Sequence, residues 1–117
     1  MRRGKLEGAL ESGYSLARMK YRVLLAPDAV EDLRRLRAYD RAKVQSNLAE
    51  LQVNPRRVGP SRIKRLRGLR KPQYRLRVGE VRVFYDVMDE PEPTVEVLAI
   101  IAKKDAARWL EREGRKV

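Results

Sequence analysis

The chain has 117 residues and a formal net charge of +12, with 28 lysines and arginines against 16 aspartates and glutamates. That length corresponds to one domain with a single modest core. The sequence contains no cysteine and no histidine, which excludes disulfides, thiolate metal sites, cysteine nucleophiles and the commonest general base. Any catalysis must therefore use lysine, arginine, tyrosine or carboxylate side chains, and we expect no metal and no cofactor.

The N-terminal part of the chain gives two readings. Residues 1–18 contain three glycines and no strand pattern, so they are either an appendage, with Met19 as the natural start, or a helix over residues 5–16. The domain itself is predicted to span residues 19–117. No apolar run approaches the roughly 20 residues of a membrane span, and the N-terminus lacks the apolar core of a signal peptide. We therefore expect a cytoplasmic protein that does not contact membranes.

The first elements of the domain are a strand and a helix pair. A short strand is predicted over residues 21–25, followed by a helix that begins at Pro27, a residue favoured at the first helical position. A second helix is predicted to be capped by Asp40 and to end before Asn54. The apolar stripes of both helices are interpreted as core.

The second half of the domain is predicted to be mostly strand. Prolines and glycines punctuate residues 55–73, with one short strand over residues 63–67, and the apolar run 94–102 is predicted to be the central strand. Asp105 is expected to cap a last helix, and the tail from Gly114 is expected to fray. The predicted fold is α+β: an N-terminal strand and two antiparallel helices on a small twisted, mostly antiparallel sheet, with a short C-terminal helix and all helices on one face.

Residues 74–85, YRLRVGEVRVFY, are predicted to form a tight β-hairpin. Apolar and basic residues alternate on both sides of a turn at Gly79 and Glu80. A two-residue turn places Arg77 directly opposite Arg82, with Arg75 on the same face. Like charges so placed are destabilising, so this face is either a solvated cationic surface or a site where guanidinium groups hold a phosphate.

The charge of the chain is concentrated around this hairpin. Residues 55–84 carry +10, whereas residues 1–27 carry +4, residues 28–54 are neutral and residues 85–117 carry −2. A charge of this size on one supersecondary unit is typical of proteins that bind polyanions. The block lacks the amphipathic helical pattern that would place it on a membrane surface.

The order of these segments resembles the RelE/ParE superfamily of toxins from type II toxin-antitoxin pairs, closest to RelE-like mRNA interferases. The resemblance spans residues 20–110. The segments that carry it are YRVLLAPDAVEDLRRL, the second helix ending in Asn54-Pro55, LRGL at 66–69, YRLRVGEVRVFYDV at 74–87 and VEVLAIIAKKDA at 95–106. It implies a RelE-like fold, a cognate antitoxin as partner and a toxic function.

Within that superfamily, RelE-like members cut messenger RNA in the ribosomal A site, whereas ParE-like members inhibit DNA gyrase. The resemblance places the catalytic roles of RelE-like toxins on a basic cluster. Its members here are Arg75, Arg77, Arg82, Lys103 and Lys104. RNA binding is assigned to Lys64, Arg65, Arg67, Arg70 and Lys71.

The implied chemistry is metal-independent cleavage by attack of a ribose 2′-hydroxyl on the adjacent phosphate. Arg75 and Arg82 suit stabilisation of the developing charge. Arg77 stands where the family's proposed base is a lysine, and a guanidinium does not deprotonate in proteins. Lys103 or Lys104 is the better candidate for the base.

Two functions therefore compete. The first is a ribosome-dependent mRNA endonuclease that inhibits translation and contacts ribosomal RNA phosphates. The second is a non-enzymatic toxin that inhibits gyrase, or a catalytically weak RNA-binding relic. The charge block favours the first. Many RelE-like members carry a tyrosine or histidine near the C-terminus, and its absence after Tyr85, together with Arg77 at the base position, favours the second. Trp109 has two interpretations, stacking on a nucleobase or packing its helix on the sheet, and packing is favoured.

Overall fold

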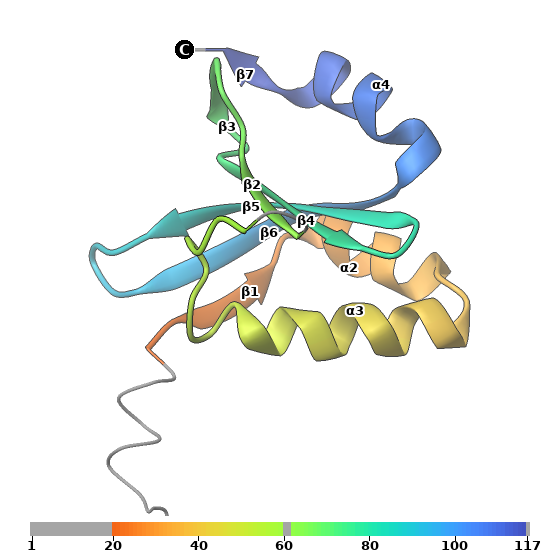
Figure 1. The fold of residues 1–117 in the computed structure, drawn as a ribbon, viewed down its shortest axis with the longest axis horizontal. Helices are drawn as coiled ribbons and strands as arrows, with labels where there is room; N and C mark the ends of the chain where they lie inside the picture. Colours follow the sequence, from red (N-terminus) through yellow and green to blue (C-terminus); the bar gives the residue numbers. More distant parts are fainter. Residues whose placement is uncertain (1–19, 60–61, 117) are drawn as a thin grey trace, which may run out of the picture.

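A computed structural model describes residues 20–59 and 62–116, and the predictions for residues 1–18 lie outside that part of the chain. Its elements form an α+β fold, as predicted from the sequence (Figure 1). None of the helices in the described ranges is long and apolar enough to cross a membrane. The elements in chain order are β1 (Arg22–Leu25), α2 (Pro27–Arg35), α3 (Ala38–Glu50), β2 (Ile63–Arg65), β3 (Leu69–Lys71), β4 (Tyr74–Val78), β5 (Val81–Met88), β6 (Thr94–Ala102), α4 (Lys103–Glu113) and β7 (Arg115–Lys116).

Five strands form the main sheet, in the order β1-β6-β5-β4-β2. The β1–β6 pair is parallel and the other pairs are antiparallel, so the sheet is mixed and mostly antiparallel. The predicted bounds of β6 are confirmed, but its predicted central place is wrong. The middle strand is β5, which is buried along all but its last residue, because both of its faces are covered by helices.

The register of the β4–β5 hairpin matches the prediction. Val78 pairs with Val81 and Arg77 with Arg82, which leaves Gly79 and Glu80 as the turn. Gly79 has φ of 57°, a left-handed conformation that glycine adopts without the steric cost of a Cβ. The turn therefore sets which face of the sheet receives the arginines.

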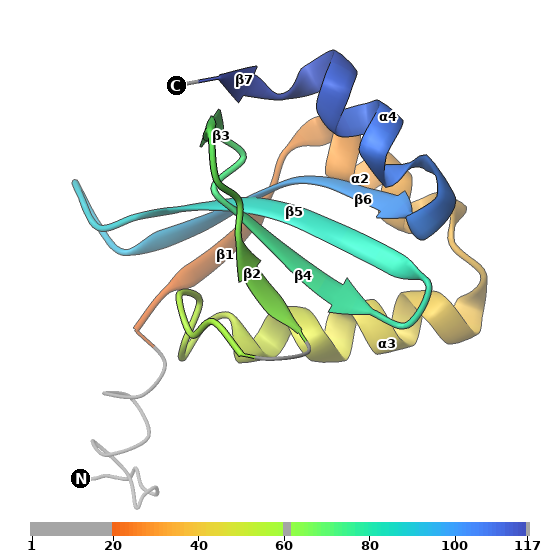
Figure 2. The same cartoon turned by 45° about the horizontal axis from the view of Figure 1, so that its top comes forward.

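Helices cover both faces of the sheet, which corrects the prediction that all helices lie on one face. In Figures 1 and 2, α2 and α3 lie on one side and α4 lies on the other. The reason is Phe84, which alternation places on the arginine face. Its side chain is fully buried because Trp109 of α4 stacks on it, with ring centroids 4.9 Å apart and planes 11° apart.

The main core lies between the sheet and the α2–α3 pair. The two apolar stripes of these helices are core, as predicted. Tyr85 is fully buried there, stacks on Tyr74 at 5.4 Å and donates its hydroxyl proton to the Pro55 carbonyl at 2.6 Å. Burial raises the pKa of the Tyr85 hydroxyl far above its ordinary value. Other buried members of this core are Ala29, Val44, Leu48, Leu51, Leu76, Val83 and Val97.

Both predicted helix caps were placed too late in the chain. The α3 helix begins at Ala38 with Arg37 in the cap position, and α4 begins at Lys103 with Ala102 in the cap position. Neither cap residue makes a side-chain hydrogen bond. Asp40 and Asp105 lie instead in the first helical turns, where their negative charge favours the positive end of the helix dipole.

The C-terminal tail forms a strand that the sequence pattern did not predict. Arg115 and Lys116 make up β7, which pairs antiparallel with β3 in a second, two-stranded sheet. The residue before β7 is Gly114, which lies against the last turn of α4. A Cβ at this position would lie 2.5 Å from the Leu110 carbonyl oxygen, so a larger residue would clash. The tail thus ties the end of α4 to the segment that follows β2.

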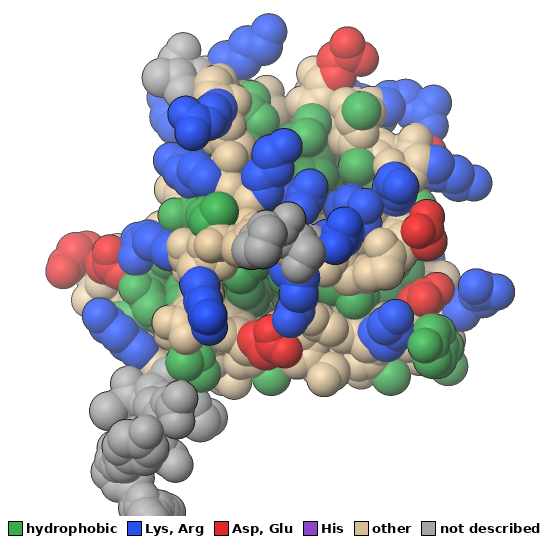
Figure 3. All heavy atoms as spheres, viewed as in Figure 1, with side chains coloured by type: hydrophobic (Ala, Val, Ile, Leu, Met, Phe, Trp, Pro, Cys, Tyr) green, Lys and Arg blue, Asp and Glu red, His purple; other side chains and the backbone are tan. Residues whose placement is uncertain are grey.

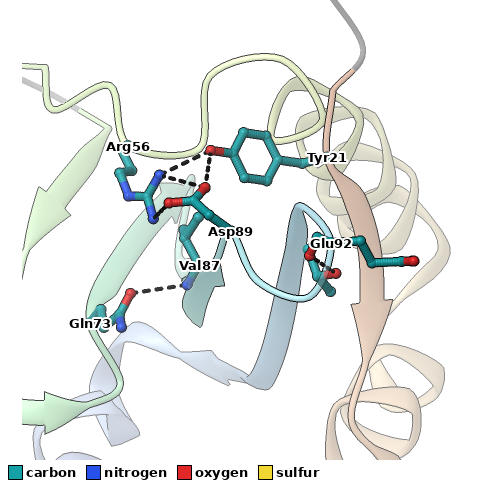
Figure 4. A network of polar contacts seen from close by, with 7 residues as sticks. Tyr21, Arg56, Gln73, Val87, Asp89 and Glu92 are labelled. Atoms are coloured by element: carbon teal, nitrogen blue, oxygen red, sulfur yellow. Dashed lines mark hydrogen bonds and ion pairs between the residues drawn. The ribbon is translucent and has the colours of Figure 1, made fainter.

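A polar cluster fixes the end of the sheet farthest from the Gly79 turn (Figure 4). Arg56 forms a two-pronged ion pair with Asp89, and its Nη2 lies 3.0 Å from Oδ2. The Tyr21 hydroxyl donates to Asp89 Oδ1 at 2.8 Å and accepts from Arg56 at 2.9 Å. Three segments distant in the sequence are joined here by groups that satisfy one another.

Candidate functional site

Four basic side chains share the sheet face opposite α2 and α3. Arg77 and Arg82 are cross-strand partners, and Lys64 of β2 is the partner of Arg75. Partners in a ladder project to the same side of the sheet. We call Lys64, Arg75, Arg77 and Arg82 the cationic face. Lysine and arginine side chains gather in a band across the middle of the molecule in Figure 3.

Arg82 is the most enclosed member of the cationic face, with 8% of its surface exposed. Its Nη1 donates to the carbonyl oxygens of Gly79 at 2.8 Å and Val81 at 3.0 Å. Burial, and next the positive charge of Arg77, lower the pKa of Arg82, while Glu80 opposes that shift. Two backbone carbonyl oxygens at the hairpin turn thus fix the position of the Arg82 guanidinium.

Arg75 is half-buried and incompletely bonded. Its Nη2 makes only a long contact of 3.4 Å to the Arg62 carbonyl oxygen, and its Nε is buried without a hydrogen-bond partner within residues 20–59 and 62–116. Burial lowers the pKa of Arg75, and the charges of Arg82 and Arg77 lower it further. A buried donor without an acceptor is costly. Because this Nε is shielded from solvent, a ligand would reach the cationic face through its exposed members, Lys64 and Arg77.

The cationic face contains three arginines that repel one another. Among the described residues, Arg75, Arg77 and Arg82 form no ion pair with a carboxylate. The nine ion pairs of that part of the chain involve other residues. Arg77 is exposed and free to contact a ligand. A phosphate bound here would reduce the repulsion between the guanidinium groups and accept hydrogen bonds from Arg77. The cationic face is therefore a candidate phosphate site.

The beginning of α4 lies beside the hairpin turn. The Lys103 backbone N–H donates to the Glu80 carbonyl oxygen at 2.8 Å, and Ala102 pairs with Val81. Lys103 and Lys104, both exposed, therefore lie at the turn end of the sheet, as Arg77 and Arg82 do. Of the five residues predicted as catalytic, the structure thus places Arg77, Arg82, Lys103 and Lys104 toward the turn end of the sheet, whereas Arg75 lies farther along β4, opposite Phe84.

The five residues predicted to bind RNA do not form one surface. Lys64 belongs to the cationic face, but Arg65 pairs with Tyr74 and lies on the opposite side, with its guanidinium 5.1 Å from the centre of the Tyr74 ring. Lys71 is engaged by two carboxylates, Asp86 at 3.4 Å and Glu96 at 3.6 Å. Arg67 and Arg70 are exposed on the turn before β3 and on β3 itself.

Trp109 packs on the sheet through Phe84, as the packing interpretation predicted. One face of its ring is therefore occupied, and base stacking would have to use the other. Sequence reasoning did not identify Phe84 as the support of α4 or the Arg62 carbonyl as the acceptor for Arg75. Phe84 carried a usable signal, since it is apolar at a position where alternation expects a polar residue. In the described ranges, no three histidine, cysteine or carboxylate side chains are grouped to hold a metal ion.

Solved structures share this arrangement of elements. The chain is 29% identical to a chain in the RelBE2 toxin-antitoxin complex of Mycobacterium tuberculosis, with a TM-score of 0.60, covering 71% of this chain and 98% of that one. An archaeal RelE-RelB complex from Pyrococcus horikoshii gives 24% identity and a TM-score of 0.60, with 73% and 97% covered. A free double mutant of Escherichia coli toxin RelE gives 22% identity and a TM-score of 0.57, with 81% and 99% covered. The fold is thus that of RelE toxins.

The sequence gives the narrower assignment. No curated protein sequence matches the chain. A family model described as the ParE toxin of the type II toxin-antitoxin system parDE matches residues 23–107, well over half of the chain. The chain therefore belongs to the ParE toxin family, within the RelE/ParE superfamily, and is a toxin of a type II toxin-antitoxin system.

Proposed function

We propose that this toxin cuts messenger RNA on the ribosome and thereby inhibits translation, and that its cationic face holds the scissile phosphate. The observation that carries the proposal is the group of three arginines without a carboxylate partner, one of which has a buried, unsatisfied Nε. These three guanidinium groups adjoin one another: besides burial, the charges of Arg82 and Arg77 lower the pKa of Arg75, and the charge of Arg77 lowers the pKa of Arg82. A bound phosphate would offset this concentrated positive charge.

The reaction proposed is an internal transfer within the RNA. The 2′-oxygen of a ribose attacks the adjacent phosphorus, and the bond from phosphorus to the 5′-oxygen of the next nucleotide breaks. One product ends in a 2′,3′-cyclic phosphate and the other begins with a 5′-hydroxyl. Arg75 and Arg82 stabilise the charge that develops on the phosphoryl oxygens, a contribution that is often the largest single one in such chemistry.

The proton transfers are assigned to the start of α4. Arg77 does not accept a proton at any ordinary pH, so it is assigned to binding the phosphate. Lys103 and Lys104 follow β6 directly and lie at the turn end. One of them accepts the 2′-proton, and the protonated amine returns it to the leaving 5′-oxygen.

Inhibition of DNA gyrase is the second candidate. Three observations favour it: the family model that matches is that of the ParE toxin, an arginine stands where RelE-like toxins carry a lysine, and no tyrosine follows Tyr85. The same charge would then serve binding alone. A catalytically weak RNA-binding relic is the third outcome.

The proposed partner is a cognate antitoxin that works in the cytoplasm. Solved relatives of this fold are toxin-antitoxin complexes. A hollow of about 490 Å³ between α2, the end of β6 and α4 suits a partly apolar antitoxin segment, because Leu36 and Ile101 line it. Its charged lining is mixed, since Asp32 and Asp105 lie beside three arginines. The outer edge of β1, which lies at the rim of the main sheet, is a second candidate dock. The arginines that line the hollow are Arg35, Arg108 and Arg112.

The test compares two targets with one protein preparation. Wild-type toxin is added to a translating extract, and cleavage of the messenger is mapped by primer extension; in parallel, gyrase supercoiling is measured with the same amounts of toxin. We expect cleavage and unaffected supercoiling, with cleavage lost in Arg77→Ala and retained in Arg56→Ala. Intact messenger together with inhibited supercoiling would replace the proposal with the gyrase function.

A further inference from the structure

We infer that Tyr39 is a nucleobase-stacking residue, and that with Lys43 it extends the cationic face around the hairpin turn onto α3. The inference deepens the proposed function and rests on it. It assigns an aromatic contact to an RNA strand whose phosphate lies at Arg77 and Arg82.

Tyr39 is the most exposed large apolar side chain in residues 20–59 and 62–116, with 72% of its surface accessible. The other aromatic residues in that part of the chain are committed to packing: Tyr21, Tyr74, Phe84 and Tyr85 are buried, and Trp109 stacks on Phe84. An aromatic ring left in water next to a polyanion site is available for stacking. It gives a base a flat apolar partner at little entropic cost.

A chain of contacts joins Tyr39 to the cationic face. The Lys43 Nζ lies 5.2 Å from the centre of the Tyr39 ring, one helical turn away. The same Nζ lies 3.5 Å from the point where a Cβ on Gly79 would stand. The Gly79 carbonyl oxygen in turn accepts the 2.8 Å hydrogen bond from Arg82. Lys43 and the hairpin turn therefore connect Tyr39 to the proposed phosphate site.

The electrostatics of this surface favour a nucleic acid strand. Lys43 forms no ion pair in the described ranges, so its ammonium is free to bind a phosphate between the scissile group and the stacked base. Glu80 is the one carboxylate of the turn and opposes binding. A positively charged path with an aromatic platform at its end is the arrangement by which proteins bind single strands.

Tyr39 has no visible role in folding. The core positions of α3 are Val44 and Leu48, and Tyr39 lies on a different side of the helix, outside the buried cluster. Substitution is therefore expected to change stability little, as for surface positions in general. This separates a binding effect from a folding effect in the test.

The experiment measures binding of the full-length toxin to a short single-stranded RNA whose 2′-hydroxyls are methylated to prevent cleavage. Fluorescence anisotropy is recorded for the intact strand and for strands with one abasic position each. We expect Tyr39→Ala to weaken binding by about 5- to 100-fold and Tyr39→Phe to retain it. Leu24→Ala, an exposed apolar side chain on β1 at the other end of the sheet, is the matched control and is expected to have no effect.

The abasic series identifies the contact. One abasic position should weaken binding to the wild type and to Tyr39→Phe but not further weaken binding to Tyr39→Ala. If the wild type binds RNA and Tyr39→Ala binds it equally well, this inference is wrong while the proposed function stands. If Tyr39→Ala loses only neutralisation by an antitoxin, the ring serves a protein interface and the inference is also wrong. If the wild type neither binds this RNA nor cuts messenger, the proposed function fails and the inference with it.

Discussion

The two ends of the β4–β5 hairpin treat charge in opposite ways. At the end farthest from the turn, Arg56 forms an ion pair with Asp89, and the Tyr21 hydroxyl makes hydrogen bonds with both of them. Toward the turn, Arg77 and Arg82 are cross-strand partners and Arg75 lies near them. None of the three forms an ion pair with a carboxylate in residues 20–59 and 62–116. The pKa shifts follow: hydrogen bonding to Asp89 raises the pKa of Arg56, while burial and neighbouring arginines lower those of Arg75 and Arg82.

We interpret the paired charges as stabilising the fold and the adjoining arginines as the proposed binding site. A sheet that needed only stability would be better served by pairs at both ends, since like charges directly opposite each other are destabilising. The turn end accepts that cost and leaves donors open. Substitutions at the two ends should therefore separate: one set should change stability, the other the response to RNA.

The largest expected effect is on cleavage. Arg82→Ala is predicted to lower the rate of messenger cleavage by about 100- to 1,000-fold, because it removes a preorganised donor from the developing charge. Arg56→Ala, at the paired end, should leave the rate unchanged. Rates come from primer extension in a translating extract, and thermal melting checks that Arg82→Ala, which also loses the bonds to the turn, remains folded. Equal losses in both variants would erase the distinction between the ends.

The next effect is on stability and concerns the paired charges. Asp86 is buried, accepts a hydrogen bond from the Gln73 backbone N–H at 2.8 Å and forms an ion pair with Lys71 at 3.4 Å. Asp86→Asn removes the charge that both donors face, so we expect the free energy of unfolding to fall by about 1 to 3 kcal/mol. Glu111→Gln, at an exposed carboxylate without an ion pair in the described residues, is the control and should change it by less than about 0.5 kcal/mol. Denaturant unfolding measures both, and equal values would contradict the assignment.

A smaller effect concerns the salt dependence of RNA binding. Each phosphate contact on a single strand contributes about 0.7 to the slope of log affinity against log salt concentration. Arg77→Ala should reduce that slope by about this amount, and Arg56→Ala should leave it unchanged. Anisotropy titrations at several salt concentrations give the slopes. A reduced slope for Arg56→Ala would mean that the paired end also binds RNA.

The smallest effect is the pH dependence of the paired end. Hydrogen bonds from Arg56, and then from Tyr21, lower the pKa of Asp89. Because the folded-state pKa lies below the ordinary carboxyl value, the contribution of Asp89 is fully present above that ordinary value and is lost as the pH falls through the folded-state value. Asp89→Asn should therefore lower Tm slightly at neutral pH and not at strongly acidic pH. A Tm difference that persists in acid would contradict this.

The hairpin was predictable because its signals are local. Strict alternation and a glycine turn determine the register and place Arg77 opposite Arg82. The same alternation marked Phe84 as an apolar side chain on the polar face, and only the structure gave its meaning, a seat for Trp109. The side of the sheet on which Arg65 lies could not be read from the sequence, since it depends on the register in which β2 pairs with β4.

The predictions that were wrong concern tertiary and boundary features. Pairing of β7 with β3 joins two short segments distant in the chain, and neither has a pattern of its own. The helices begin at Ala38 and Lys103 without a side-chain cap, so the nearest aspartate was a misleading marker. For the site, the sequence pattern predicted that Arg75, Arg77 and Arg82 share one face of the sheet, but it could not show that Lys71 is held by Asp86.

Cleavage of messenger RNA by attack of the 2′-hydroxyl can be tested through the chemistry of the cut ends. Toxin is added to a translating extract with a messenger of mapped cleavage site, in its natural form and with a single 2′-deoxy nucleotide at that site. The account predicts a 2′,3′-cyclic phosphate and a 5′-hydroxyl at the natural site and no cleavage of the deoxy messenger. Cleavage of the deoxy messenger at the same position, or ends of another kind, would contradict it.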